Sequence, residues 1–326
     1  MDSVSAEPAK VSVDKNFELR DGTTYRPFSL RQMSDPFVVE VRRNGVLEAV
    51  HRVHAVAVRN GAVVEARGDA GLTCFMRSSS KPLQALPLVR ARDDLSQADI
   101  AIACASHRAT PEQLAAARAL LQKANATEDD LELGLQEGRP PQKIYNNCSG
   151  KHAGMLALCD TRGWPKPGYH EPHHPVQQAC AEAHAEAAHA SVDELPQGND
   201  GCGVVTFAMP LERMAFAFSN LPQLPEAQRI AAAMRARPEL VGGPDGADVQ
   251  LMQLTDSWIA KGGAEGLLCA VDLATRTGIA LKAEDGAQRA IGPALAAFVD
   301  VHLPQSFVKN TRQEIVGELS LRTTSA

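Results

Sequence analysis

The chain has 326 residues, 22% of them charged and 44% apolar, a composition typical of a globular protein with a sizeable core. Its formal net charge of −6 argues against nucleic acid or an anionic membrane as a partner, because both bind basic surfaces. No stretch approaches the 18 consecutive apolar residues of a membrane span, and the opening residues lack the apolar run of a secretory signal, so we expect a cytoplasmic protein.

Residues 1–34 are polar and weakly patterned, and we interpret them as an N-terminal extension to one domain, residues 35–326, which could form two lobes. Three apolar stretches follow, separated by Asn44-Gly45 and Asn60-Gly61. Asn-Gly between apolar strands is typical of a tight hairpin. The sequence therefore predicts an antiparallel meander of three strands.

Helices are predicted in the middle of the chain. Thr110 and Gln113 form a capping box around Pro111, which occupies the first helical position of EQLAAARALLQKA. Further helices are expected over residues 176–190 and about 226–236, followed by two strands within 265–286 and a closing helix over 290–303. Strands at both ends with helices between them favour an α+β fold, one antiparallel sheet covered by helices.

The stretch RSSSKP, residues 77–82, predicts a helix that begins at Ser78 or Ser79, because Pro82 is tolerated only in a first turn. We expect Pro87 to kink this helix or end it early. Ser78 and Lys81 would share one helix face. A neutral lysine could take the serine's proton, and S-x-x-K is the arrangement of β-lactamases and penicillin-binding proteins. The alternative is a helix cap beside a solvated lysine.

A second serine–lysine pair is suggested by Ser106 and Lys282. Ser106 lies in a loop before the capped helix, and Lys282 lies in an apolar strand where a lone lysine is unusual. Two lysines that converge on one pocket repel each other, which lowers the pKa of one of them. The alternative for Lys282 is an edge strand from which its amine reaches solvent.

Seven cysteines are scattered without a disulfide framework, so we expect free thiols. Cys148 and Cys202 differ from most of the others because they lie in polar, glycine-rich loops. Cys148, Lys151 and His152 would share one helix face, and Asp200 precedes Cys202 in GNDGCG. Two thiols with a nitrogen or carboxylate ligand could hold zinc, and the residues favour His152 as the nitrogen ligand. The alternative is two unrelated loop cysteines.

Taken together, the motifs resemble the bacterial asparaginase II family, the L-asparaginases found in rhizobia, from about Asp35 to about Gly317. The stretches that carry this resemblance are RSSSKPLQALP, CASHRATPEQ, NNCSGKHAGMLALC, GNDGCG and LKAEDG. The resemblance implies a serine β-lactamase-like fold, a homodimer, and hydrolysis of L-asparagine to L-aspartate and ammonia. It matches Ser78–Lys81 and Ser106–Lys282 to two catalytic pairs. It also places zinc on Cys148, Lys151 and Cys202, which replaces His152 by Lys151 as the nitrogen ligand.

A mechanism follows as a hypothesis. Arg77 would bind the substrate α-carboxylate, Asp200 its α-ammonium group, and His152 would form a hydrogen bond nearby. Ser78 is the preferred nucleophile, because its lysine is in the same helical turn, and an acyl-enzyme would form. Zinc would orient the substrate rather than polarise the amide. The competing interpretations are a serine amidase of β-lactamase or glutaminase type, and a zinc-binding protein without catalytic activity.

Overall fold

The computed structural model describes residues 17–18, 24–25 and 34–322. The predicted N-terminal extension lies outside the described residues except for Ser34 and the paired strands β1 (Phe17–Glu18) and β2 (Thr24–Tyr25). Its division from a domain over residues 35–326 stays a prediction. Within the described residues, no helix is long and apolar enough to cross a membrane.

The predicted meander is present as β3 (Phe37–Arg43), β4 (Val46–Arg59) and β5 (Ala62–Arg67), all paired antiparallel. Both Asn-Gly pairs adopt positive φ angles, 48° and 80° in the first turn and 52° and 75° in the second. Asparagine and glycine tolerate this left-handed conformation, which tight hairpin turns require at both central positions. The turn chemistry thus explains why the strands reverse where they do.

The main sheet joins strands from both ends of the chain in the order β12-β13-β3-β4-β11-β10-β9, with β5 also paired to β4. Its later strands are β9 (Trp258–Gly263), β10 (Leu267–Asp272), β11 (Thr277–Ala283), β12 (Phe307–Lys309) and β13 (Ile315–Leu321). The closing helix is shorter than predicted: α10 ends at Phe298, and the chain returns as β12 and β13, which the sequence analysis missed.

Helices occupy most of residues 81–254, as predicted. They are α1 (Lys81–Ala91), α2 (Gln97–Ala103), α3 (Pro111–Lys123), α4 (Ser149–Arg162), α5 (Pro175–Ala188), α6 (Leu211–Asn220), α7 (Ala227–Ala236), α8 (Pro238–Val241), α9 (Ala247–Leu254) and, later in the chain, α10 (Ile291–Phe298). A small sheet, β6-β8-β7, lies among them, built from β6 (Thr73–Phe75), β7 (Gln197–Asn199) and β8 (Val205–Pro210). α1 continues through Pro87 to Ala91, so it does not end early there, and the alternative of a kink stays a prediction. Its buried Leu83 and Leu86 help to anchor the helix, which packs on α4 and α5.

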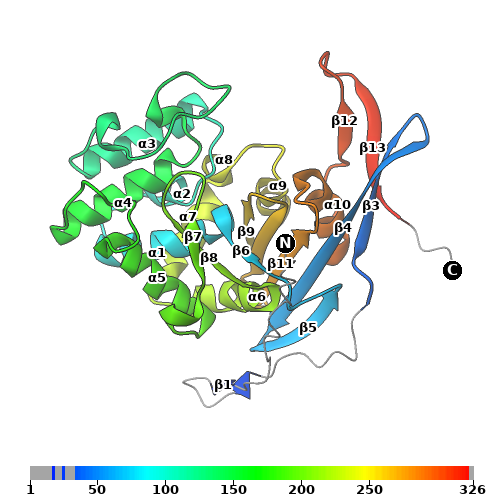
Figure 1. Cartoon of the computed structure of the whole chain (residues 1–326), viewed down its shortest axis with the longest axis horizontal. Coiled ribbons are helices and arrows are strands. Elements are labelled where there is room, and N and C mark those ends of the chain that lie inside the picture. Colours follow the sequence, from blue (N-terminus) through cyan, green and yellow to red (C-terminus); the bar gives the residue numbers. More distant parts are fainter. Residues whose placement is uncertain (1–16, 19–23, 26–33, 323–326) are drawn as a thin grey trace, which may run out of the picture.

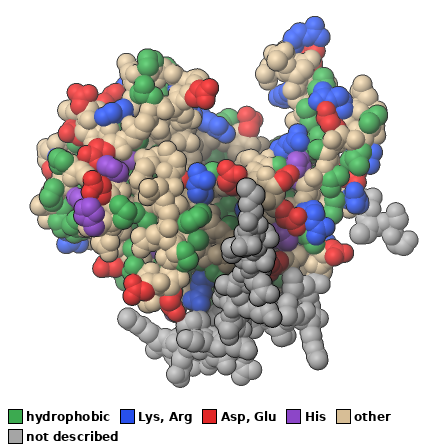
Figure 2. All heavy atoms as spheres, in the orientation of Figure 1, with side chains coloured by type: hydrophobic (Ala, Val, Ile, Leu, Met, Phe, Trp, Pro, Cys, Tyr) green, Lys and Arg blue, Asp and Glu red, His purple; other side chains and the backbone are tan. Residues whose placement is uncertain are grey.

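The helices lie in layers on the sheet, which confirms the α+β class (Figure 1). α6 packs on β4, β10 and β11. A Cβ at Gly278 of β11 would lie only 2.0 Å from the carbonyl oxygen of Ala215, so a larger residue there would push α6 away. Beyond the helices, the ends of β3 and β4 project with β12 and β13 as an arm, and a notch separates this arm from the helical body in Figure 2.

Candidate active site

A buried lysine begins α1, directly after the 3-10 turn Arg77–Ser80. Arg77 has a φ of 49°, which turns the chain sharply between β6 and this short helix. Ser80 Oγ donates to the Arg77 carbonyl at 2.8 Å, and Ser79 Oγ donates to the Lys261 carbonyl at 3.0 Å. The first bond closes the turn, the second fixes it against β9, and Lys81 follows with a fully buried side chain.

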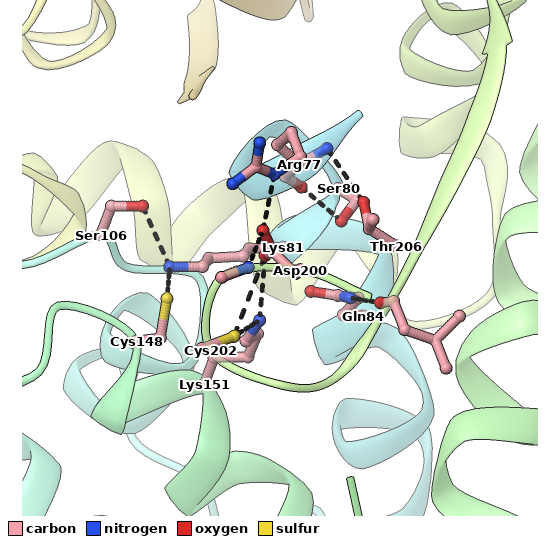
Figure 3. A network of polar contacts seen from close by, with 12 residues as sticks. Arg77, Ser80, Lys81, Gln84, Ser106, Cys148, Lys151, Asp200, Cys202 and Thr206 are labelled. Atoms are coloured by element: carbon pink, nitrogen blue, oxygen red, sulfur yellow. Dashed lines mark hydrogen bonds and ion pairs between the residues drawn. The ribbon is translucent and has the colours of Figure 1, made fainter. Parts of the chain in front are cut away.

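Lys81 contacts Ser106 rather than Ser78 (Figure 3). The side chain is fully buried, and Nζ donates to Ser106 Oγ at 3.0 Å, the Ala105 carbonyl at 2.5 Å and Cys148 Sγ at 3.3 Å. Among the described residues, no hydrogen bond involves Ser78 Oγ. Lys81 Nζ is therefore bonded to the loop after α2, and the predicted contact with Ser78 is absent.

Burial lowers the pKa of Lys81. Lys151 and Lys261 lower it further by repulsion. A buried amine with a lowered pKa and a hydroxyl 3.0 Å away has the two properties of a general base beside a nucleophile.

A second buried lysine, Lys151, lies in the first turn of α4 and contacts the loop between β7 and β8. Its Nζ is 3.0 Å from Cys202 Sγ and 3.7 Å from Asp200 Oδ2. Burial lowers the pKa of Lys151, but the charges of Cys202 and Asp200 outweigh burial and raise it. This lysine is thus held as a cation.

The side chains of the two loop cysteines interact, and each shifts the pKa of the other. Cys148 lowers the pKa of Cys202 to about 5, and the charge of Lys151 lowers it as well, against the effect of burial. Cys202 and burial raise the pKa of Cys148 to about 12. Cys202 is therefore the thiolate of the pair and Cys148 the thiol. All seven cysteines are free, as predicted.

Arg77 and Asp200 bind each other in the structure (Figure 3). Arg77 Nε donates to Asp200 Oδ1 at 2.7 Å. Burial raises the pKa of Asp200, but Lys151 and Arg77 outweigh burial and lower it to about 2. The site therefore contains one cation and one anion of the kind that a zwitterionic ligand needs, paired to each other.

His152 is buried one residue after Lys151. Its Nδ1 lies 2.6 Å from the Tyr169 hydroxyl, and its Nε2 has no hydrogen-bond partner within the described part of the chain. Burial and the charge of Lys151 lower the pKa of His152 to about 3, so the ring is neutral at pH 7. It can donate or accept a single hydrogen bond through Nε2.

Lys282 does not join this group. It lies in β11, between His54 of β4 and Leu267 of β10, and its Nζ donates to the Ala283 carbonyl. No hydrogen bond or ion pair between described residues links it to Ser106. The structure therefore does not form the predicted Ser106–Lys282 pair, because β10 separates β11 from β9, the strand that contacts the Arg77–Ser80 turn.

Lys261 of β9 is the second lysine beside Lys81, and the sequence analysis missed it. It is buried, with 1% of its surface exposed, and its charge acts on Lys81. Its Nζ donates to the Gly262 carbonyl at 2.8 Å and lies 3.5 Å from Asp248 Oδ2. The signal that could have identified it is a lone lysine within WIAKGG, a short apolar run that we did not assign as a strand.

Zinc fits the donor atoms of Cys148, Lys151 and Cys202 in kind, since the metal prefers sulfur and nitrogen ligands. Among the residues that the structure describes, no group of three His, Cys, Asp or Glu side chains is arranged to hold a metal. The third donor would have to be Lys151. An amine binds metal only when neutral, so zinc would have to displace the proton that Cys202 and Asp200 stabilise.

Comparison with known proteins identifies the family. The L-asparaginase II family model matches residues 39–319, most of the chain. The chain belongs to the L-asparaginase II family. This confirms the resemblance inferred from the five motifs, and it supports amide hydrolysis as the type of reaction. None of the curated proteins matches the sequence.

Solved structures show distant likeness only. Mglu in its native form is 15% identical with a TM-score of 0.43, over 77% of this chain and 65% of that one, so the chain spans just under two thirds of Mglu. The β-lactamase from Sphaerobacter thermophilus DSM 20745 is 16% identical, with a TM-score of 0.39, over 77% and 90%. A putative β-lactamase from Bacteroides dorei DSM 17855 is 13% identical, with a TM-score of 0.41, over 71% and 84%.

Proposed function

We propose that this member of the family hydrolyses L-asparagine to L-aspartate and ammonia. The observation that carries the proposal is the buried Lys81, whose amine contacts the Ser106 hydroxyl at 3.0 Å. Burial and neighbouring cations favour the neutral amine, which is the form that can accept a proton. Family membership supplies the expectation that the substrate is an amide.

Ser106 is the nucleophile in this proposal, in place of Ser78. Lys81 Nζ takes the Ser106 proton while Oγ attacks the side-chain amide carbon of asparagine. The C–N bond then breaks, and the leaving nitrogen takes a proton from Lys261 and departs as ammonia. Water then attacks the resulting ester. Lys81 returns its proton to Ser106, one water proton goes to Lys261 and the other to solvent, so aspartate is released and the site is restored.

Substrate recognition would use the Arg77–Asp200 pair. Asparagine carries an α-carboxylate and an α-ammonium group, so it can replace one internal ion pair by two, one with Arg77 and one with Asp200. Lys151 stays beside Asp200 at 3.7 Å and prevents an excess of negative charge when Arg77 turns toward the ligand. His152, neutral and with Nε2 unpartnered, would contribute the hydrogen bond predicted for it.

Zinc, if bound, would be held by Cys148, Lys151 and Cys202, where it would supply a fixed positive charge that orients a bound anion. The homodimer and the cytoplasmic location also remain proposals, and sedimentation equilibrium of the full chain tests the first.

The test is ammonia release from L-asparagine by the wild type, Ser106→Ala and Ser78→Ala, with zinc content measured on the same samples. We expect Ser106→Ala to lose activity by ~10³-fold or more, and Ser78→Ala to lose much less. The reverse order would return the nucleophile to Ser78. Rates with glutamine and nitrocefin in parallel separate an asparaginase from a glutaminase or a β-lactamase.

A further inference from the structure

One loop contacts both Ser106 and Lys261. This loop, residues 241–248, runs from the end of α8 to the first turn of α9. At one end, the Val241 carbonyl accepts from the Ser106 backbone N–H at 2.8 Å. At the other end, Asp248 Oδ2 accepts from the Gly262 N–H at 2.8 Å and lies 3.5 Å from Lys261 Nζ. The loop therefore sets the position of Ser106 relative to Lys261.

Three glycines lie close to the Asp248 carboxylate, where a larger residue would collide with it or crowd it. A Cβ at Gly246 would lie 2.5 Å from Oδ1, and one at Gly262 would lie 3.2 Å from Oδ2. Gly242 approaches the carboxylate from a third side, where a Cβ would be 3.7 Å from Oδ1. The backbone thus encloses this carboxylate closely, and Asp248 is only 7% exposed. Such a fit leaves the carboxylate few positions other than the one beside Lys261.

The charges around Lys261 explain why an anion is needed there. A buried lysine without an anionic partner tends to lose its proton. The titratable groups whose charges interact with Lys261 from other elements are Asp248 of α9, Lys81 of α1 and Cys104 after α2. Within the part of the chain that the structure describes, Asp248 is the one carboxylate ion-paired with Lys261. It offsets the repulsion between the two amines.

We propose that Asp248 is a positioning residue for the amide hydrolysis proposed above: by pairing with Lys261 it keeps the proton donor of that reaction in place. In that reaction the departing nitrogen takes its proton from Lys261, so the carboxylate acts through the lysine rather than on the substrate. The inference rests on the proposed function, but the pairing of Asp248 with Lys261 can be tested without turnover.

The experiment compares Asp248→Asn with the wild type. We expect kcat to fall by ~10-fold or more at neutral pH, with KM changed much less, because proton donation is lost while substrate contacts remain. The alkaline limb of the kcat profile should move to lower pH, since the amine loses its proton more readily without the carboxylate. Asp256→Asn is the matched control: it removes an exposed carboxylate from the connection that follows α9 and should leave the profile unchanged.

A double-mutant cycle shows whether Asp248 acts through Lys261. In a Lys261→Met background, Asp248→Asn should add little to the loss of kcat, because the residue that it positions is absent. Equal losses in both backgrounds would overturn the proposal, as would an Asp248→Asn enzyme with the wild-type profile. If Asp248→Asn alone is too unstable to assay, the double variant can still be compared with Lys261→Met, in which Asp248 has no lysine to pair with.

A readout independent of activity separates this proposal from the proposed function. In protein labelled with [15Nζ]lysine, the Lys261 signal is assigned by its loss in Lys261→Met. With Asp248→Asn, the signal of the neutral amine should appear at lower pH than in the wild type. If this shift is seen while the wild type releases no ammonia from asparagine, the pairing is right and the function is wrong. Turnover without any shift rejects the role of Asp248.

Discussion

Two buried lysines at the site, Lys81 and Lys151, are 0% and 3% exposed, yet they are in opposite states. Lys81 faces a carbonyl, a hydroxyl and the protonated thiol of Cys148, so burial dominates and its pKa falls. Lys151 faces a thiolate and a carboxylate, so attraction dominates and its pKa rises. The difference shows that burial prepares a lysine for either role, and that its partners decide between base and structural cation.

The strongest test of this comparison removes the neutral lysine. Lys81→Met should reduce ammonia release by ~10³-fold or more, since no other described amine contacts Ser106, while the apolar methionine fits a buried position. Lys309→Met, which changes an exposed lysine of β12, should behave as the wild type. Activity within tenfold of the wild type in Lys81→Met would mean that Lys81 is not the base.

A weaker effect is expected when the charged lysine is removed. In Lys151→Met the acid limb of the pH profile should move to higher pH, because Lys151 is one of the cations that lower the pKa of Lys81. The sign follows from the base: Lys81 works when neutral, so activity is lost as pH falls through its pKa, and a raised pKa brings that loss at higher pH. The measurement is kcat/KM from pH 5 to 9 in chelator-treated enzyme. An unmoved limb would remove Lys151 from the control of Lys81.

The smallest effect is expected at Lys282, which the motifs had suggested as the partner of Ser106. Lys282→Met should retain activity within about threefold of the wild type, because Lys282 lies in β11 and donates to the backbone of its own strand. Thermal unfolding of the same variant checks that the sheet is intact. A loss as large as that of Lys81→Met, with an unchanged melting temperature, would show that Lys282 reaches the reacting groups.

Much of the fold could be predicted from local chemistry. The Asn-Gly turns and the capping box at Thr110 act over a few residues, so the sequence predicted β3, β4, β5 and α3. β13 could not be found in this way. Its alternation is short, and it is stabilised by pairing with β3, almost the whole chain away. Long-range pairing leaves little trace in a local pattern.

The sequence predicted which residues gather at the candidate site better than it predicted which serine pairs with which lysine. The motifs named Lys81, Ser106, Cys148, Lys151 and Cys202, and the structure brings these together. The pairing of serine with lysine was wrong in its geometry, because helical spacing says which residues share a face but not how far a long side chain extends. Lys261 was missed because strand order, which places β9 beside the Arg77–Ser80 turn, depends on the whole sheet.

The pairing of β13 with β3 has a consequence for synthesis. Leu319 of β13 aligns with Val41 of β3, so β3 lacks this neighbour until the residues around Leu319 have been synthesised. Until then β3 has one unpaired edge, which could pair with the same strand of another nascent chain. Low temperature or slow expression should therefore raise the yield of correctly folded protein more than it does for a protein built from local contacts.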